Sequence, residues 1–338
     1  MTVTPGLQQG LPTKTAKIDG INSIFADMEL FKWSGAGNTF VVIDGREGSL
    51  PSGEAAACGL RTADEIRRLC KDFGTDGLMI LTASPAGNDF AMEFYNPDGS
   101  SGMMCGNGGR CIVAFADWLG IKPKGEMPDR VGHDGRAGHD VYVFDAPDGA
   151  HRAEILREEE MPDCVGHDGR AGRGSKVWTV RLQMKDVEGF DEYPDGLFLN
   201  TGTRHFVKFV PDVEAIDIEA EALPIRRDAR FAPEGTNVNF VEAGRPIGSG
   251  IKIRTFEKGV EGETAACGTG ITASAIACRY KGITPNGQVP AESASSRISY
   301  RLQAREATLT VDFVQKKKDA FTDVFLTGPA ELIGRRSL

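Results

Sequence analysis

Residues 94–117, FYNPDGSSGMMCGNGGRCIVAFAD, determine how the rest of this chain can be arranged. An aromatic pair leads into a polar, glycine-containing loop, then a Cys-Gly-x-Gly turn at Cys105, then a small and apolar run that is typical of a buried helix. A second stretch, FEKGVEGETAACGTGITASAIACRY at 256–280, keeps the same order around Cys267. Nine residues before each cysteine stands a polar side chain, Asn96 in the first copy and Lys258 in the second. The two copies predict two similar halves that face one site.

The Cys-Gly-x-Gly turn has a physical meaning of its own. Its glycines relax the backbone sterically and leave N–H groups that point outward, where they attract anions. The N-terminus of the following helix favours a carboxylate and lowers the pKa of a thiol. Two such thiols on opposite sides of one carbon could remove a proton from one face and return it to the other. This geometry is typical of a racemase or an epimerase.

Seven ordered motifs resemble the diaminopimelate epimerase family, a group of cofactor-independent amino-acid epimerases of the two-cysteine type. Each motif alone is weakly specific, whereas their order along most of the chain is difficult to obtain by chance. The motifs are FKWSGAGNTFVVID (31–44), FGTDGLMIL (73–81), FYNPDGSSGMMCGNGGRC (94–111), LNTGTRHFVKFV (199–210), EGTNVNFVE (234–242), FEKGVEGETAACGTG (256–270) and FLTGPAELI (325–333).

The resemblance implies an α+β fold of two pseudo-symmetric domains, each a curved and mainly antiparallel sheet wrapped around the helix that follows its cysteine. Residues 28–184 together with 322–338 are expected to form the N-terminal domain, and 185–321 the C-terminal domain. The last strand, near 322–333, is expected to cross back to the first domain, and the active site to lie in the cleft between the two.

The resemblance also implies the chemistry. It predicts the interconversion of LL- and meso-diaminopimelate in lysine and cell-wall precursor biosynthesis, with one cysteine as thiolate and the other as thiol. No cofactor or metal is expected, and the family is expected to form a homodimer. The implied catalytic residues are Cys105, Cys267, His205 and Glu257, and the implied substrate contacts are Asn38, Asn96, Gly106, Asn107, Asn237, Lys258, Gly268 and Thr269. Asn38 has a second interpretation, since asparagine is also a common turn residue.

Two motifs depart from the family pattern. The chain has Glu257-Lys258-Gly259 where the family usually has Glu-Arg-Gly, and Thr203-Arg204-His205 where it has Asn-Pro-His or Ser-Pro-His. Lysine keeps the positive charge but lacks the bidentate fork that holds a carboxylate. These departures leave open a cofactor-independent racemase of another amino acid, such as histidine.

Two interpretations from other classes compete with an isomerase. The run from Gly268 to Ala273 fits the GxGxxG/A dinucleotide fingerprint, although the acidic loop before it separates it from the preceding strand. A non-catalytic binding protein on the same fold is expected to lose one cysteine, and both cysteines are present. The remaining cysteines of the motif helices and of residues 58–70 are interpreted as small core residues.

Composition narrows the class of protein further. The chain has 338 residues, a formal net charge of -9 and 40% hydrophobic residues, which is typical of a globular protein of two domains and argues against nucleic-acid binding. It contains no apolar run of about 18 residues and no apolar core of a signal peptide. Seven cysteines without a CxxC pair argue against a disulfide framework and favour the cytoplasm.

Residues 1–27 and 127–174 fall outside this pattern. The first segment is interpreted as a flexible extension with a short helix at 18–27, and Met28 as the functional start. The second contains an exact repeat, MPDRVGHDGRAG at 127 and MPDCVGHDGRAG at 161, which is interpreted as two insert loops at 127–140 and 161–174. A metal site at His133 and His167 is the alternative, and local duplication of a polar loop explains the pattern more simply.

Overall fold

The computed structural model describes residues 29–46, 62–102, 104–124, 140–160, 176–243, 250–284 and 297–337. The expected N-terminal extension lies outside these ranges, as do both repeated motifs with their histidines.

The first half of the fold is a closed ring of strands. Hydrogen bonds connect β1 to β2, β2 to β3 and so on to β7, and the second part of β17 pairs with both β7 and β1. The β2–β3 and β4–β5 pairs are parallel, and the others are antiparallel. The elements are β1 (Glu29–Gly35), β2 (Asn38–Asp44), α1 (Ala63–Phe73), β3 (Leu78–Thr82), β4 (Phe90–Tyr95), α2 (Gly106–Trp118), β5 (Val141–Ala146), β6 (Gly149–Glu160) and β7 (Lys176–Gln183).

The second half repeats this plan. Strands β10, β11, β12, β13, β15, β16 and the first part of β17 follow one another, with parallel pairs at β11–β12 and β13–β15. The elements are β8 (Val187–Glu188), β9 (Asp191–Tyr193), β10 (Gly196–Asn200), β11 (Arg204–Phe209), α3 (Ile218–Arg226), η2 (Ala229–Phe231), β12 (Asn237–Ala243), β13 (Ile251–Glu257), β14 (Gly262–Thr264), α4 (Gly268–Tyr280), β15 (Arg297–Gln303), β16 (Thr308–Lys317) and β17 (Ala320–Ser337).

One helix occupies the centre of each sheet. Most of α2 and of α4 is inaccessible to solvent on every side, which suits a helix enclosed by a curved sheet. Their sequences, GNGGRCIVAFADW and GTGITASAIACRY, are rich in glycine and alanine, so the surrounding strands can approach closely. Cys111 lies in this packed interior as predicted, and Cys278 of α4 is buried as well.

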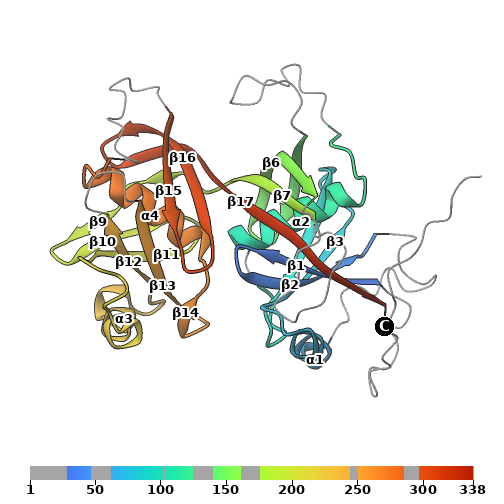
Figure 1. The fold of residues 1–338 in the computed structure, drawn as a ribbon, viewed down its shortest axis with the longest axis horizontal. Coiled ribbons are helices and arrows are strands. Elements are labelled where there is room, and N and C mark those ends of the chain that lie inside the picture. The colour runs from blue at the N-terminus through green and yellow to red at the C-terminus, as the bar shows by residue number, and fades with distance from the viewer. Residues whose placement is uncertain are drawn as a thin grey trace, which may run out of the picture.

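The outer helices are of the usual amphipathic kind. Helix α1 begins after Thr62, whose hydroxyl accepts a hydrogen bond from the N–H of Glu65, and the carboxylate of Glu65 accepts one from the N–H of Thr62. It ends at Gly74 in a left-handed conformation, as the sequence predicted. Helix α3 connects β11 to β12 just as α1 connects β2 to β3, and both lie at the same edge of their halves (Figure 1).

Strand β17 joins the two halves. It runs antiparallel to β16 in the second half and then continues into the first half, between β1 and β7 (Figure 1). The predicted crossing strand is therefore confirmed, with wider bounds than the expected 322–333. The α+β fold of two pseudo-symmetric sheets around central helices is confirmed as well. The predicted stretch 197–210 is two strands, because a turn at 201–203 separates β10 from β11.

Candidate active site

The two cysteine turns meet at the junction of the halves. Cys105 is the N-cap of α2 and Cys267 is the N-cap of α4. The glycines that follow them are in contact, since a Cβ on Gly268 would lie 3.1 Å from the Cα of Gly106. Glycine is therefore required here by close approach of two backbones rather than by an unusual φ angle. The sequence-predicted pair of Cys-Gly turns is brought together around one place.

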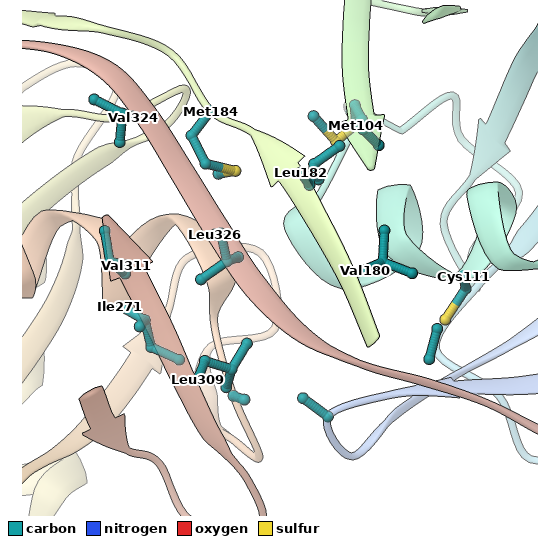
Figure 2. Packing of buried hydrophobic residues seen from close by; sticks show 14 of the residues in the cluster. Met104, Cys111, Val180, Leu182, Met184, Ile271, Leu309, Val311, Val324 and Leu326 are labelled. Carbon is teal, nitrogen blue, oxygen red and sulfur yellow. The ribbon is translucent and has the colours of Figure 1, made fainter. Parts of the chain in front are cut away.

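A leucine from the crossing strand supports this junction. The Cδ2 of Leu326 would lie 2.8 Å from a Cβ on Gly106 and 2.9 Å from one on Gly268. Figure 2 shows Leu326 on β17 between Met184, which follows β7, and Ile271 of α4. The strand that joins the halves thus also fixes the floor beneath both helix N-termini.

Asn107 bridges the two halves by hydrogen bonds. Its amide nitrogen donates to the side-chain oxygen of Asn38 at 2.5 Å and to the carbonyl of Ala266 at 2.7 Å. Its amide oxygen accepts a hydrogen bond from Arg110 at 2.9 Å. Ala266 directly precedes Cys267, so Asn107 connects the turn after the first cysteine to the turn before the second. Its predicted role as a substrate contact stays a prediction.

The pKa of Cys105 is raised, whereas a helix N-terminus was expected to lower it. Burial raises the pKa of Cys105 to about 11. The N–H of Gly108, which donates to the sulfur at 3.2 Å, acts in the opposite direction, as does the positive charge of Arg110. Nearby Glu257 raises the pKa further. Desolvation outweighs the helix terminus because the site is largely closed to water.

Cys267 has a still higher pKa. Burial is the largest cause, and the negative charge of Glu257 adds to it. The sulfur lies 3.4 Å from the hydroxyl oxygen of Thr269, whose hydrogen bond lowers the pKa. A negative charge on Cys105 raises the pKa of Cys267 further, so the titrations of the two thiols are linked.

His205 lies behind Cys267, entirely buried. Its Nδ1 is 3.0 Å from the amide nitrogen of Asn239, which also donates to the carbonyl of Phe206 at 3.3 Å. A carbonyl can only accept, so the amide nitrogen of Asn239 faces both atoms and Nδ1 of His205 is an acceptor. The proton of the neutral imidazole is therefore on Nε2. Burial lowers the pKa of His205 to about 3, which keeps the ring neutral.

The Nε2–H of His205 points to two hydroxyl groups. The oxygens of Thr203 and Thr269 each lie 2.9 Å from Nε2, and 3.0 Å from each other. Thr269 can accept from the imidazole and turn its own proton toward the sulfur of Cys267. His205 is therefore placed as a neutral hydrogen-bond donor to Thr269, whose hydroxyl in turn contacts the sulfur of Cys267.

Glu257 and Lys258 stand where β13 ends. Burial raises the pKa of Glu257, and its charge acts on both cysteines, so the carboxylate belongs to the same site. The N–H of Lys258 donates to the side-chain oxygen of Asn237 at 2.8 Å, while the amide nitrogen of Asn237 donates to the carbonyl of Arg204 at 2.9 Å. The Lys258 side chain is exposed.

The other predicted residues lie around this centre with partners of their own. The amide nitrogen of Asn96 donates to the hydroxyl of Ser100 at 3.0 Å, within the loop before Cys105. The amide of Asn38 lies 3.4 Å from the carboxylate of Asp76. Arg204, from the motif that departs from the family pattern, forms an ion pair with Glu234 at 2.5 Å.

Sequence reasoning missed two buried side chains of this site, Arg110 and Asn239. Each carried a signal. Arg110 is the one charged residue in the first ten positions of an otherwise small and apolar helix. Asn239 stands two positions after Asn237 in a strand, so both amides belong to the same face of β12.

Among the residues that the structure describes, no group of three His, Cys, Asp or Glu side chains is placed to hold a metal ion. The described helices include none that is long and apolar enough to cross a membrane.

Comparison with solved structures agrees with this fold. The phenazine biosynthesis protein of the PhzF family from Bacillus anthracis is similar over 92% of this chain and 98% of its own, with a TM-score of 0.57 and 12% sequence identity. The two-lobed fold and the paired cysteine turns define the class of two-cysteine epimerases and racemases.

Sequence comparison is more specific. The sequence model of the diaminopimelate epimerase family matches residues 30–130 and 197–317. Diaminopimelate epimerase from Flavobacterium psychrophilum is 35% identical over 90% of this chain and 98% of its own length, and that from Aquifex aeolicus is 38% identical over 89% and 94%. The chain belongs to the diaminopimelate epimerase family.

Proposed function

We propose that this protein is an isomerase that interconverts LL- and meso-diaminopimelate by proton transfer at an α-carbon. The observation that carries the proposal is the contact between Gly106 and Gly268, which sets the N-caps Cys105 and Cys267 on either side of one place. Family membership supports the choice of substrate.

The proposed chemistry uses two thiols in turn. One cysteine, as thiolate, removes the α-hydrogen, and the other, as thiol, returns a proton on the opposite face. The α-carboxylate is placed between the two helix N-termini, whose free N–H groups stabilise the charge that builds up as the α-carbon loses its proton. Cys267 is buried and Cys105 is partly buried, which limits the access of water to the exchange.

The pKa of Cys105 near 11 also has a place in this scheme. An α-hydrogen is a very weak acid, and a base of raised pKa is a stronger base once it is deprotonated. The ammonium group of the substrate, held beside Glu257, brings a positive charge that favours the thiolate. Substrate binding itself thereby prepares the base.

The remaining assignments belong to the same proposal. The residues proposed to contact the substrate are Asn38, Asn96, Gly106, Asn107, Asn237, Lys258, Gly268 and Thr269. Lys258 is proposed to bind the distal carboxylate as a point charge, without the bidentate fork of an arginine. A homodimer is proposed on the basis of the family. The cytoplasm is proposed as the compartment because a pair of free thiols needs reducing conditions.

The test is α-hydrogen exchange in deuterated buffer, with reductant and without added cofactor. LL-diaminopimelate should gain deuterium with inversion, while free histidine and lysine should not. Cys105→Ala and Cys267→Ala should each lower turnover by at least about 10³-fold, because either change removes one of the two proton carriers.

Matched controls exist on the same two helices. Cys111→Ala on α2 and Cys278→Ala on α4 remove buried core thiols, and both should keep turnover within about threefold of the parent. Turnover retained in either Cys105→Ala or Cys267→Ala would contradict the two-thiol scheme. Exchange restricted to another amino acid would contradict the proposed substrate.

A further inference from the structure

Arg110 is a buried cation that has no anionic partner among the residues that the structure describes. It lies on α2, five residues after Cys105, and is fully buried. Its guanidinium donates to the carbonyl of Gly106 at 3.0 Å, to the side-chain oxygen of Asn107 at 2.9 Å and to the carbonyl of Pro329 at 3.3 Å. Within the described part of the chain, no carboxylate accepts a hydrogen bond from it. Burial lowers the pKa of Arg110 to about 10, so the group remains charged at neutral pH.

This arrangement is costly unless the charge has a use. A buried ion is normally paired, because neutral acceptors replace only part of its lost hydration. The other buried arginine among the described residues is paired in this way, since Arg181 donates to Glu154 at 3.1 Å and to Asp312 at 2.7 Å. Arg110 therefore holds an uncompensated positive charge at the place where the two halves meet.

The three acceptors of Arg110 surround both cysteine turns. Gly106 follows Cys105 directly. Asn107 is held by Arg110 on one side and itself holds the carbonyl of Ala266, directly before Cys267. Pro329 belongs to β17, the strand that connects the halves. The guanidinium of Arg110 thus contacts the turn after Cys105 and strand β17 directly. It reaches the turn before Cys267 through the amide of Asn107.

The charge of Arg110 also acts on the sulfur. The field of the guanidinium favours the thiolate form of Cys105, against Glu257, which disfavours it. Two charges therefore act in opposite directions on the pKa of Cys105: the guanidinium of Arg110 lowers it and the carboxylate of Glu257 raises it. In a site closed to water, such fields are stronger than they are at a protein surface.

We propose that Arg110 is a positioning residue whose buried positive charge stabilises the Cys105 thiolate, while its hydrogen bonds hold the two cysteine turns at a fixed separation. The inference deepens the proposed function and rests on it for the role of the thiolate. In this proposal, the anion that balances the charge of Arg110 is the thiolate formed when Cys105 loses its proton.

The experiment is alkylation of Cys105 by iodoacetamide, followed by mass spectrometry of the peptide that contains it, between pH 7 and 10. The rate is proportional to the thiolate fraction. Arg110→Met and Arg110→Gln remove the charge and should slow alkylation by about tenfold or more, with the pH profile displaced upward by about one unit. Arg110→Lys keeps the charge and should keep the rate within about twofold.

Turnover measurements test the second part of the proposal, that the hydrogen bonds of Arg110 hold the two cysteine turns at a fixed separation. Lysine cannot make the three hydrogen bonds of the fork, so Arg110→Lys should lower kcat by about tenfold or more with little change in KM. The matched control is Arg181→Met, which removes a buried arginine whose partners are Glu154 and Asp312. It should lower stability and leave the Cys105 alkylation rate unchanged.

Three outcomes would overturn the proposal. The first is an unchanged Cys105 alkylation profile in a folded Arg110→Met or Arg110→Gln variant. The second is an equally slow Cys105 in Arg181→Met. The third is failure of both neutral variants to fold while Arg110→Lys keeps full kcat, since Arg110 would then serve stability alone. Alkylation needs no substrate, so its result can be interpreted even if the parent does not exchange the α-hydrogen of diaminopimelate. That failure would contradict the proposed function alone.

Discussion

At the scale of single residues, the site is controlled by desolvation. Helix N-termini favour thiolates in general, and here the N–H of Gly108 does lower the pKa of Cys105. Burial nevertheless raises the pKa of both cysteines above that of a free thiol. A closed site and an easily ionised thiol are opposed requirements, and this protein favours the closed site.

A pH dependence follows from the sign of this shift. A raised pKa means that the proton is held more tightly, so the thiolate fraction of Cys105 should increase about tenfold per pH unit until the pH approaches about 11. Alkylation rates of the substrate-free protein measured at pH 7, 8 and 9 should follow that slope. A plateau reached by pH 8 would contradict it.

A second residue-scale prediction concerns the tautomer of His205. Asn239→Asp replaces the amide that donates to Nδ1 with a carboxylate that accepts from it, so the proton should move from Nε2 to Nδ1 and the pKa should rise from about 3. The hydrogen bond to Thr269 would then lose its donor, and kcat should fall by about tenfold or more.

Nitrogen-15 NMR of histidine-labelled protein reads this change directly. The chain has five histidines, and a His205→Gln variant identifies the signal of interest. Thr255→Val is the matched control, because it removes the hydroxyl that donates to the other end of the Asn239 amide at 3.0 Å and leaves the donor to His205 in place. An Nδ1–H tautomer in the parent would show that the amide of Asn239 has the opposite orientation.

At the scale of elements, the two central helices meet at Gly106 and Gly268. Gly268→Ala would place a methyl group 3.1 Å from the Cα of Gly106 and 2.9 Å from Leu326, so the helix N-termini must move apart. A displacement of about 1 Å between reacting groups can cost about 10²-fold in rate, and kcat is expected to fall by that order.

Stability should change far less than turnover in this variant, by about 1 to 3 kcal/mol, since one methyl group is accommodated by a small shift. Gly262→Ala is the control, because nothing lies within 4 Å of its added Cβ and its φ angle is ordinary. Denaturation and steady-state kinetics of both variants decide the matter. Parent-like kcat in Gly268→Ala would show that the separation of the helices is not critical.

At the scale of the whole molecule, a buried ion pair holds the halves together alongside β17. Arg181 of β7 donates to Asp312 of β16 at 2.7 Å, and its guanidinium lies over the ring of Phe325, 3.5 Å from the centroid. This contact is away from the cysteine turns in sequence and connects strands of opposite halves.

Asp312→Asn should therefore destabilise the fold by about 3 kcal/mol, because it removes one of the two carboxylates that compensate the buried guanidinium of Arg181 and leaves only Glu154. Urea denaturation with the parent as reference measures the change. Asp323→Asn is a surface comparison on the neighbouring strand β17, where an effect below about 0.5 kcal/mol is expected. Equal stability of Asp312→Asn and the parent would show that Glu154 alone compensates Arg181.

The sequence by itself determined the repeated plan, the cysteines, the helices that follow them and the family. These are local features: glycine in a turn, small residues in an enclosed helix, alternation in strands and a capping box at Thr62. Motif order also led to the crossing strand. Local pattern is sufficient here because each half encloses its own helix and needs few distant contacts to be recognised.

Only the tertiary structure decided how the site works. The contact of Gly106 with Gly268 and the hydrogen bonds from Asn107 to Ala266 and from Asn239 to His205 join residues that are far apart in the sequence. The burial of Arg110, with no carboxylate acceptor in the described part of the chain, is likewise a property of the folded molecule. The direction of the thiol pKa shifts depends on burial, which both halves create together. The distance of a charge from water is a property of the assembled molecule, and no sequence motif encodes it.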